Sequence, residues 1–330
     1  SMPQMILVEA INLAIKQEMK RDPTVMVMGE DVGLNGGVFR VTDGLMKEYG
    51  RDRVVDTPLS ESGIIGTAVG LSINGFKPIC EIQFDGFIPP AFDQIISHAS
   101  RMRWRSQGRF TCPIVIRAPF VGGVRALEHH SESTEAIYAQ IPGLKVVMPA
   151  TPYDAKGLMA SAIRDPDPVL FCEPKRLYRA IKDDVPEEEY TIPLGVASMV
   201  QEGTDVTIVT WGAMRWVCEK AILQMQKDPE LSKISVELID LRTIYPFDAD
   251  MVVASAQKTG RCIIVHEASR SGGWGAEISS QIMEKALFNL KAPVVRVTGF
   301  DVPPPLLKTE HYYLPDEKRV IAAIKEIVAQ

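Results

Sequence analysis

Residues 54–78 place one carboxylate, Glu61, where it could do acid–base chemistry. Glu61 stands between Ser60 and Ser62, directly ahead of a stretch in which small residues recur at helical spacing: Gly63, Gly66, Ala68 and Gly70. A glycine inside a helix costs about 1 kcal/mol relative to alanine, so the run indicates that another backbone approaches this helix closely. Glu61 is then either a first-turn residue that suits the helix dipole or a buried group held against a ligand. This stretch alone leaves both interpretations open.

Two histidines, His129 and His130, lie on a loop that follows a predicted strand and the turn at Gly122 and Gly123. A histidine at the mouth of a parallel sheet can act as an acid or base near neutral pH, or donate a hydrogen bond. Adjacent histidines could also bind a metal ion, but no Cys, Asp or Glu residues at zinc-like spacing accompany them. The alternative is an ordinary solvated loop histidine, and the residues alone do not decide between these roles.

A third candidate group, Gln83, Asp85 and Phe87, stands at the end of a predicted strand. Phe87 could offer its aromatic face to a planar heterocycle, although an aromatic residue at a strand end is more often part of the core. The glycine-rich loops at residues 29–39 and 270–280 lack the GxGxxG and GxxxxGK(S/T) spacings of nucleotide-binding loops. Neither loop therefore predicts a phosphate site.

The composition is typical of a globular protein. Of 330 residues, 46% are hydrophobic and 24% are charged, and the formal net charge is −6. Basic residues are spread along the chain, which argues against nucleic acid and membrane surfaces as partners. Five cysteines stand far apart without a CxxC pair, and we expect them to be reduced core thiols: Cys80, Cys112, Cys172, Cys218 and Cys262. We therefore expect a cytoplasmic protein (mitochondrial matrix in a eukaryote), with no signal peptide and no membrane-spanning segment.

Short apolar runs alternate with longer amphipathic ones along most of the chain. Helical spacing predicts helices over residues 5–23, 89–108 and 151–167. Strands are predicted at the apolar runs 24–29, 53–56, 77–84, 112–119, 144–149 and 168–174. Such alternation predicts a mostly parallel sheet with helices on both faces.

An acidic, proline-containing stretch at residues 180–195 interrupts this alternation and is interpreted as an inter-domain linker. After it, strand-like runs and a last helix are predicted at residues 204–212, 234–242, 260–268, 292–299 and 316–330. We therefore predict an α/β protein of two doubly wound domains, residues 1–185 and residues 186–330. Ligands in such folds bind at the carboxyl ends of the strands.

Several ordered motifs resemble one family, the beta subunits of the thiamine diphosphate-dependent 2-oxo acid dehydrogenases. The motifs run through nearly the whole chain: GEDVG…GGVFR, DTPLSESGIIGTAVG, EIQFDGFIPPAFDQI, HHSES…PGLKVVMPATPYDAKGL, VPEEEYTIPLG, LIDLRTIYPFD and KTGRCIIVHEA. They resemble both pyruvate and branched-chain members, and EIQFDGFIPPAFDQI and QEGTDVTIVTWG favour the branched-chain members. The family's fold is a transketolase-like pyrimidine-binding domain followed by a transketolase C-terminal-type domain, in agreement with the two predicted domains.

The resemblance implies that Glu61 is the family's cofactor-activating glutamate, because it occupies the acidic position of DTPLSESG. A buried carboxylate bonded to the aminopyrimidine ring favours the imino form that removes the thiazolium proton, and burial would raise the pKa of Glu61. His130 fits the family's active-site histidine better than His129 does, and would steady the 2-oxo acid carboxylate or the intermediate and help reductive transfer to a lipoyl group. Phe87 stands where some members have Tyr beside the aminopyrimidine, and Gln83 and Leu59 would be neighbours of the cofactor.

The resemblance also implies a structural potassium ion, held mostly by backbone carbonyl groups. The matching positions are Ile114, Val115, Ala162, Asp165 and Asp167. At Asp167 the sequence departs from the asparagine associated with this site in the family.

Nothing in the chain resembles the GDG…N segment through which thiamine enzymes hold Mg²⁺ and the diphosphate. In this family that segment lies on the alpha subunit. The resemblance therefore implies an α2β2 heterotetramer, with thiamine diphosphate between the two kinds of subunit. An acyltransferase core that carries lipoyl groups is a further implied partner.

The implied activity is the oxidative decarboxylation of a 2-oxo acid, branched-chain or pyruvate, with transfer of the acyl group to a lipoyl group. An acetoin dehydrogenase beta subunit is an alternative with the same cofactor and another substrate. A non-catalytic subunit that only scaffolds its partner is a second alternative, which intact activity after replacement of Glu61 would favour.

Overall fold

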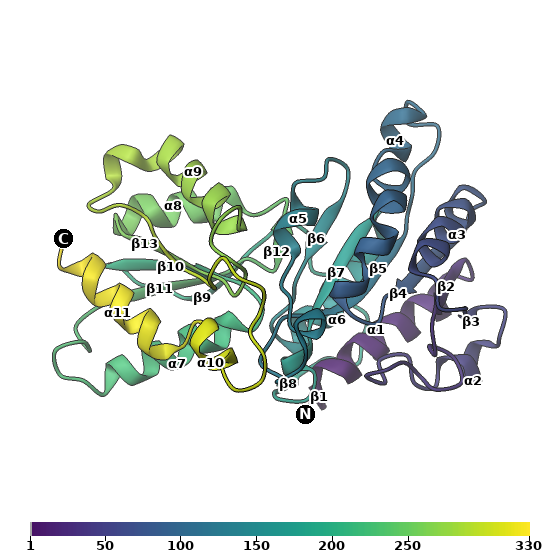
Figure 1. The fold of residues 1–330 in the computed structure, drawn as a ribbon, viewed down its shortest axis with the longest axis horizontal. Helices are drawn as coiled ribbons and strands as arrows, with labels where there is room; N and C mark the ends of the chain where they lie inside the picture. Colours follow the sequence, from purple (N-terminus) through teal and green to yellow (C-terminus); the bar gives the residue numbers. More distant parts are fainter. Residues whose placement is uncertain (1) are drawn as a thin grey trace. The chain divides into compact units, whose positions relative to one another are not determined.

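The computed structural model describes residues 2–330, and the chain divides into two compact units (Figure 1). The first unit extends to Phe120 and resumes over Ile137–Leu194, whereas the second unit takes Val121–Ala136 and Gly195–Gln330. A short segment from the first half of the sequence therefore belongs to the second unit. The sequence predicted two continuous domains with a boundary between residues 185 and 186. That boundary stays a prediction, because the compact units are discontinuous in sequence.

A parallel sheet forms the middle layer of the first unit. Its strands lie in the order β6-β7-β5-β4-β2-β3, and each neighbouring pair among them is parallel. They are β2 (Val25–Gly29), β3 (Val54–Asp56), β4 (Lys77–Glu81), β5 (Val115–Phe120), β6 (Lys145–Val147) and β7 (Val169–Pro174). β2, β5 and β7 are buried over their whole length, as expected for strands covered on both faces. The short strands β1 (Gln4–Ile6) and β8 (Lys182–Asp184) form a separate antiparallel pair.

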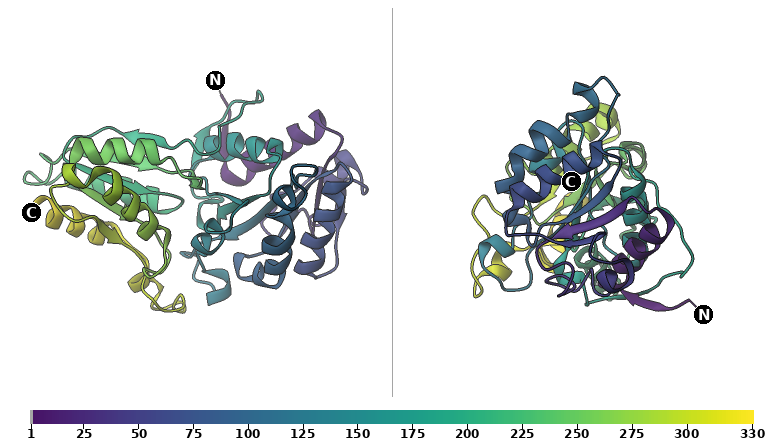
Figure 2. Two further views of the ribbon diagram at one scale, coloured as in Figure 1. Left: turned by 90° about the horizontal axis from the view of Figure 1, so that it is seen from above. Right: turned by 90° about the vertical axis from the view of Figure 1, so that its right-hand side faces the viewer.

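Helices cover both faces of this sheet. α1 and α6 pack together on one face, and α3 and α4 lie on the other (Figure 2, left). The helices are α1 (Leu7–Arg21), α2 (Leu45–Tyr49), α3 (Glu61–Ile73), η1 (Asp85–Phe87), η2 (Pro89–Ala91), η3 (Gln94–Ala99), α4 (Met102–Arg105), α6 (Pro152–Arg164) and η5 (Lys175–Leu177). α5 (Glu135–Ala139) begins in the second unit and ends in the first. Thr151 caps α6 by accepting a hydrogen bond from the N–H of Asp154 at 3.1 Å.

The segment 89–108, predicted as one helix, is divided into the 3-10 turn η2, the π-helix η3 and the short α4. The N–H of Ser100 donates to the carbonyl of Ile95, five residues earlier, at 3.0 Å. The Ser100 hydroxyl donates to the carbonyl of Ile96 at 2.9 Å and so takes the acceptor that an α-helix would give to the N–H. This competition explains the wider π turn.

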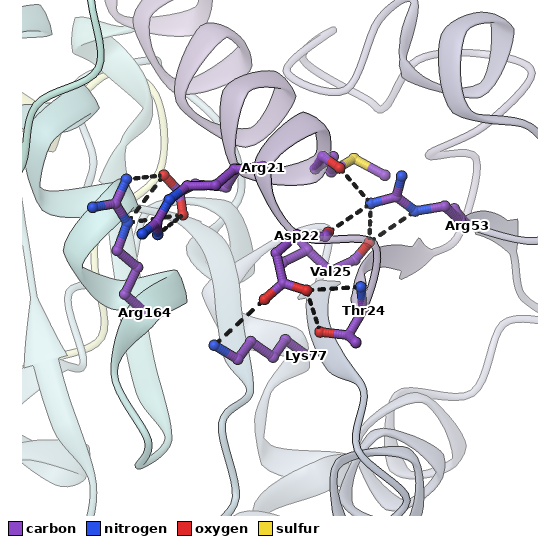
Figure 3. A network of polar contacts seen from close by, with 9 residues as sticks. Arg21, Asp22, Thr24, Val25, Arg53, Lys77 and Arg164 are labelled. Carbon is purple, nitrogen blue, oxygen red and sulfur yellow. Dashed lines mark hydrogen bonds and ion pairs between the residues drawn. The ribbon is translucent and has the colours of Figure 1, made fainter.

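A polar network ties the amino ends of three strands of the first unit together (Figure 3). The Asp22 carboxylate, ahead of β2, accepts bonds from the N–H and the hydroxyl of Thr24 at 2.9 and 2.6 Å, and pairs with Lys77 of β4 at 3.6 Å. Arg53, ahead of β3, donates to the carbonyl oxygens of Asp22 and Val25 at 3.0 and 2.8 Å. The carboxyl ends of the same strands, at the other edge of the sheet, carry the predicted site residues.

The second unit has its own sheet, in the order β14-β13-β10-β11-β9, parallel except for β9. α8 and α9 pack together on one face, and α7 and α11 close a hydrophobic core on the other (Figure 1). The elements are η4 (Glu128–His130), β9 (Ser198–Gln201), β10 (Val206–Thr210), α7 (Met214–Gln226), β11 (Val236–Asp240), β12 (Thr243–Tyr245), α8 (Ala249–Thr259), β13 (Cys262–Val265), α9 (Trp274–Ala286), η6 (Leu287–Asn289), β14 (Val295–Val297), α10 (Glu310–Tyr313) and α11 (Glu317–Val328). The two sheets with their helical layers confirm the predicted α/β fold.

The cysteines agree with the predicted core thiols, because all five are free and buried. Within residues 2–330 no helix combines the length and the apolar character needed to cross a membrane. The same residues contain no group of three or more His, Cys, Asp or Glu side chains placed to hold a metal ion.

His266, directly after β13, is fully buried in the second unit. Its ring stacks on Trp211 with 5.4 Å between the ring centroids, and its Nδ1 lies 3.2 Å from the carbonyl oxygen of Ala268. A Cβ atom at Gly273 or Gly275 would lie 2.7 or 2.9 Å from the imidazole. The two glycines therefore allow α9 to close over the ring.

Burial of His266 predicts a loss of stability in mild acid. Burial lowers its pKa to about 4 from the ordinary 6.5, and the charges of Arg296 and Arg270 add to this effect. Between these pH values the unfolded chain binds a proton that the folded chain does not, so the free energy of unfolding falls as the pH falls. We expect His266 to contribute a loss of about 3 kcal/mol, complete below pH 4 and visible in urea unfolding followed by tryptophan fluorescence.

Two variants isolate this effect from that of other titrating groups. His266→Asn removes the imidazole and should flatten the dependence of the urea midpoint on pH in this window. His311→Asn, at an exposed position, should keep the slope of the unmodified chain. Equal slopes for His266→Asn and the unmodified chain would refute the assignment to His266.

Candidate active site

Three adjacent parallel strands bring the predicted cofactor residues to one edge of the first sheet. β3 and β4 flank β2 in register, so that their carboxyl ends are level. The segments after these ends carry Leu59, Glu61, Gln83 and Phe87. Carboxyl ends of parallel strands are the usual place of ligands in doubly wound sheets. The structure thus places these four residues at the expected edge.

Glu61 is the first residue of α3, and Ser60 caps this helix by accepting a hydrogen bond from the N–H of Gly63 at 3.2 Å. The Glu61 side chain is partly exposed, and Leu59 beside it is 78% exposed. The burial of Glu61 expected from the sequence is therefore not provided by this chain. The carboxylate remains accessible from outside the unit.

The small-residue face of α3 is only partly covered by the described residues. A Cβ atom at Gly70 would meet no atom within 4 Å, whereas the nearest atoms to one at Gly66 belong to the side chain of Gln94, at 3.2 Å. The run of glycines predicted a backbone packed closely against this helix. Residues 2–330 supply no such backbone at Gly70.

Glu30, the residue directly after β2, adds a second carboxyl group to this edge. Burial raises the pKa of Glu30, and the negative charges of Glu61, Asp31 and Glu81 raise it further. Because neighbouring carboxylates repel each other, Glu30 holds a proton more readily than an isolated glutamate does. Glu30 was not among the site residues predicted from the sequence, although an acidic side chain directly after a wholly apolar strand was an available signal.

A buried salt-bridge network fixes the neighbouring strand ends. Arg117 of β5, only 1% exposed, donates twice to Glu173 of β7 at 2.8 Å and once to Glu81 of β4 at 2.7 Å. The Tyr178 hydroxyl donates to Glu173 at 2.6 Å. Burial opposes the charge of Arg117, but Glu173 and Glu81 outweigh burial and raise the pKa of the guanidinium. Glu81 is thus held in place as one of the charges near Glu30.

Phe87 lies in η1 and is half-buried, as is Gln83. The Phe87 ring meets Phe84 edge-to-face at 6.1 Å between centroids, and Phe84 meets Phe39 at 5.7 Å. Such contacts give the Phe87 ring a defined orientation. Its stacking on a heterocycle, and the cofactor contacts of Gln83 and Leu59, stay predictions.

The two predicted histidines belong to the second unit. They lie in η4, within Val121–Ala136. His129 is exposed, with Nδ1 3.4 Å from Oε1 of Glu128, whereas His130 is partly buried. Because Glu61 belongs to the first unit, the two predicted catalytic residues are carried by different units.

Two family models match the chain in succession. Residues 4–181 match the transketolase pyrimidine binding domain, and residues 195–320 match the transketolase C-terminal domain. The pyruvate dehydrogenase E1 component subunit beta of Acholeplasma laidlawii is 54% identical over 321 residues, 97% of each chain. The subunit of the same name from Bacillus subtilis (strain 168) is 50% identical over 327 residues, 99% of each chain. The chain belongs to the family of thiamine diphosphate-dependent 2-oxo acid dehydrogenase beta subunits.

A solved structure agrees with the fold of this beta subunit. The chain is similar to a split-gene transketolase, described as an inactive beta4 tetramer, with a TM-score of 0.79. The two chains are 22% identical, and 98% of each is covered. At this identity the likeness shows the fold alone. The family matches confirm the resemblance found in the sequence motifs.

Two of the residues predicted to hold a potassium ion in this beta subunit already have cationic partners. The Asp165 carboxylate pairs with Lys145 at 2.7 Å, and the Asp167 carboxylate pairs with Arg103 at 2.8 Å. These side chains are therefore neutralised without a bound ion. An ion at these positions would have to rely on backbone carbonyl groups.

Two of the predicted carbonyl ligands also take part in the fold. The carbonyl of Ile114 accepts the N–H of Val169 at 3.0 Å, and the carbonyl of Ala162 accepts the N–H of Asp165 at 3.3 Å. A carbonyl oxygen has a second lone pair, so these bonds leave room for a cation. Potassium at these positions, with Val115, stays a prediction.

Proposed function

We propose that this beta subunit supplies part of an active site that decarboxylates pyruvate oxidatively and passes the acetyl group to a lipoyl group. The observation that carries the proposal is that Glu61 and Glu30 lie at the carboxyl ends of adjacent parallel strands in a member of a thiamine-dependent family. Relatives 54% and 50% identical are named as pyruvate dehydrogenase subunits and support pyruvate as substrate. They give no support to the branched-chain preference that two sequence motifs favoured.

The residues at this edge fit the pyrimidine end of thiamine diphosphate. Glu61 offers a carboxylate at a helix start, Phe87 offers an aromatic face, and Glu30 offers a carboxyl group with a raised pKa. When bound, the cofactor supplies a carbon nucleophile and takes up the electron pair that carbon dioxide leaves behind. In our proposal Glu61 accepts a hydrogen bond from a pyrimidine nitrogen and thereby holds a proton at the ring, beside Gln83 and Leu59.

The proposal includes an alpha subunit in an α2β2 heterotetramer, which holds Mg²⁺ and the diphosphate and without which this chain is inactive. The open position at Gly70 of α3 supports such a partner, because a glycine costs a helix stability but leaves room for another backbone to approach. A covering chain would also exclude water from around Glu61. The acyltransferase core that carries the lipoyl groups is a further proposed partner. A cytoplasmic location belongs to the same proposal and is supported by the buried free cysteines.

His130 is proposed to act in the transfer to the lipoyl group. We expect His130→Ala to lower the rate of transfer to free lipoamide by about a hundredfold, as for a lost acid–base residue. Decarboxylation measured with an artificial electron acceptor should change little. His129→Ala, at the exposed neighbouring position, is the matched control and should preserve both rates. Equal losses in the two assays for His130→Ala would contradict this role.

The experiment that tests the proposed function is capture of the chain from its native extract under mild salt, with its partners identified by mass spectrometry. We expect a near-stoichiometric protein that carries a GDG…N segment. The captured complex is then supplied with thiamine diphosphate and Mg²⁺ and assayed with pyruvate, branched-chain 2-oxo acids and acetoin. Pyruvate should be the preferred substrate.

Two results would contradict the proposal. A chain that is captured alone and yet binds thiamine diphosphate and Mg²⁺ tightly would refute the divided active site. A complex that turns over acetoin but no 2-oxo acid would refute the substrate class while keeping the cofactor.

A further inference from the structure

The segment that carries His130 has a strained backbone at its start. Val121 adopts a φ of 74°, Gly123 a φ of 88° and Arg125 a φ of 54°. A positive φ is unfavourable for a β-branched residue such as Val121 and costs about 1–3 kcal/mol, so surrounding contacts have to hold it. The N–H of Val121 donates to the carbonyl of Glu132 at 2.8 Å and closes the segment into a loop.

Two buried carboxylates hold the turn at the start of this loop. Glu267, just after β13, accepts the N–H of Gly122 at 2.6 Å. Glu310, the first residue of α10, accepts the N–H of Gly123 at 2.7 Å. Each glutamate is 4% exposed. At 2.6 and 2.7 Å both hydrogen bonds are short, so these two contacts are strong constraints on the backbone.

The other end of the loop is anchored to the same sheet edge. Glu135, 1% exposed, accepts the indole N–H of Trp211 at 3.0 Å and the hydroxyl of Ser133 at 2.6 Å. Trp211 follows β10, which pairs in parallel with β13. Burial raises the pKa of Glu135, and the charge of Glu267 adds to the rise. Both ends of the loop are thus fixed at the carboxyl ends of neighbouring strands.

We propose that Glu267 and Glu310 are positioning residues. They fix the position of His130 by accepting hydrogen bonds from the N–H groups of Gly122 and Gly123. Burying two carboxylates is costly, and an apolar pair could fill the same space without that cost. Each of the two carboxylates has an oxygen bonded to a definite donor, and both donors belong to the turn that leads to His130. The inference rests on the proposed role of His130 in transfer to the lipoyl group.

Variants at Glu310 test the proposal in the complete heterotetramer. Glu310→Met keeps the side-chain volume but removes the acceptor, whereas Glu310→Gln keeps an amide oxygen that can accept the N–H of Gly123. We expect Glu310→Met to slow transfer to free lipoamide by about tenfold to a hundredfold, because a displaced catalytic group is costly. Decarboxylation with an artificial acceptor should stay within about threefold, and Glu310→Gln should restore transfer.

Hydrogen exchange gives a second readout that does not depend on activity. Backbone amides in 121–136 should exchange faster in Glu310→Met than in the unmodified complex, and not in Glu310→Gln. The same pair of variants at Glu267 repeats the test at the N–H of Gly122. If a variant at one glutamate fails to fold, the variants at the other glutamate still test the proposal. Unchanged exchange in both Met variants would overturn the proposal, whatever His130 does.

A double variant separates this inference from the role of His130. If Glu310 acts through His130, Glu310→Met should cause no further loss of transfer in the His130→Ala background. Losses that multiply would overturn the positioning role. Normal transfer in His130→Ala alone would instead refute the proposed function of His130. The hydrogen-exchange measurement would still test whether Glu310 and Glu267 hold the loop.

Discussion

Glu61→Gln is expected to lower the turnover of the assembled enzyme by about a hundredfold to ten-thousandfold, the range for a lost acid–base group. Glutamine has nearly the same shape and can still accept a hydrogen bond, but it carries no negative charge and cannot hold a proton at the cofactor ring. The measurement is pyruvate decarboxylation with an artificial electron acceptor at saturating thiamine diphosphate and Mg²⁺. Sedimentation should show a normal heterotetramer.

The alternative role of Glu61, as a first-turn residue of a helix, has a matched control in α11. Glu317 is also the first residue of its helix, is also partly exposed and also follows a capping residue, Asp316. If Glu61 acts only on the helix dipole, both Gln variants should lose about 0.3–1 kcal/mol of stability and no activity. Turnover of Glu61→Gln close to that of Glu317→Gln would exclude the catalytic role and favour a scaffold.

Arg117→Met should produce the largest loss of stability among the variants considered. Removing Arg117 leaves Glu81 and Glu173 as buried carboxylates without their cation, a change that costs about 3–5 kcal/mol. Urea unfolding of the isolated chain, followed by circular dichroism, should show a much lower midpoint or no folded baseline. Tyr178→Phe removes one hydrogen bond to Glu173 and should cost only about 1 kcal/mol.

An exposed ion pair provides the control for Arg117. Arg103 pairs with Asp167 at a similar distance, 2.8 Å, but its side chain is 49% exposed. Arg103→Met should therefore change the stability by about 1 kcal/mol or less. If Arg117→Met and Arg103→Met lose similar amounts of stability, the expectation that burial increases the cost of losing Arg117 would be wrong.

The layered fold was predictable because many of its strands are continuous apolar runs in the sequence. Residues 25–29 and 169–174 are buried along their whole length, and a strand covered on both faces needs no polar alternation. The division of 89–108 was not predictable in the same way. It depends on a single hydroxyl, that of Ser100, taking a carbonyl from the helix ladder.

The positions of several candidate site residues could be predicted from the sequence, but their exposure and their contacts could not. Glu61 lies where the motif indicated, but its exposure follows from which faces of α3 other elements cover. The raised pKa of Glu30 arises from burial and from the charges of Glu61 and Glu81 on two other segments, in addition to that of the neighbouring Asp31. The glutamates that hold the His130 loop lie 145 and 187 residues beyond their glycine partners. Hydrophobic periodicity depends on residues that are close in sequence. Contacts between residues more than a hundred positions apart therefore cannot be inferred from it.

The passage of Val121–Ala136 into the second unit has a consequence for gene recombination within the family. A crossover between two parental genes at residues 185 and 186 would look neutral, because it keeps both predicted domains whole. The hybrid would nevertheless combine the Gly122 turn of one parent with Glu267 of the other. The Gly122 and Gly123 contacts use main-chain N–H groups, so they persist wherever the second parent keeps its two glutamates. The contact of Glu135 with Trp211 joins two side chains across the same crossover, so a working hybrid should also need this tryptophan in the second parent.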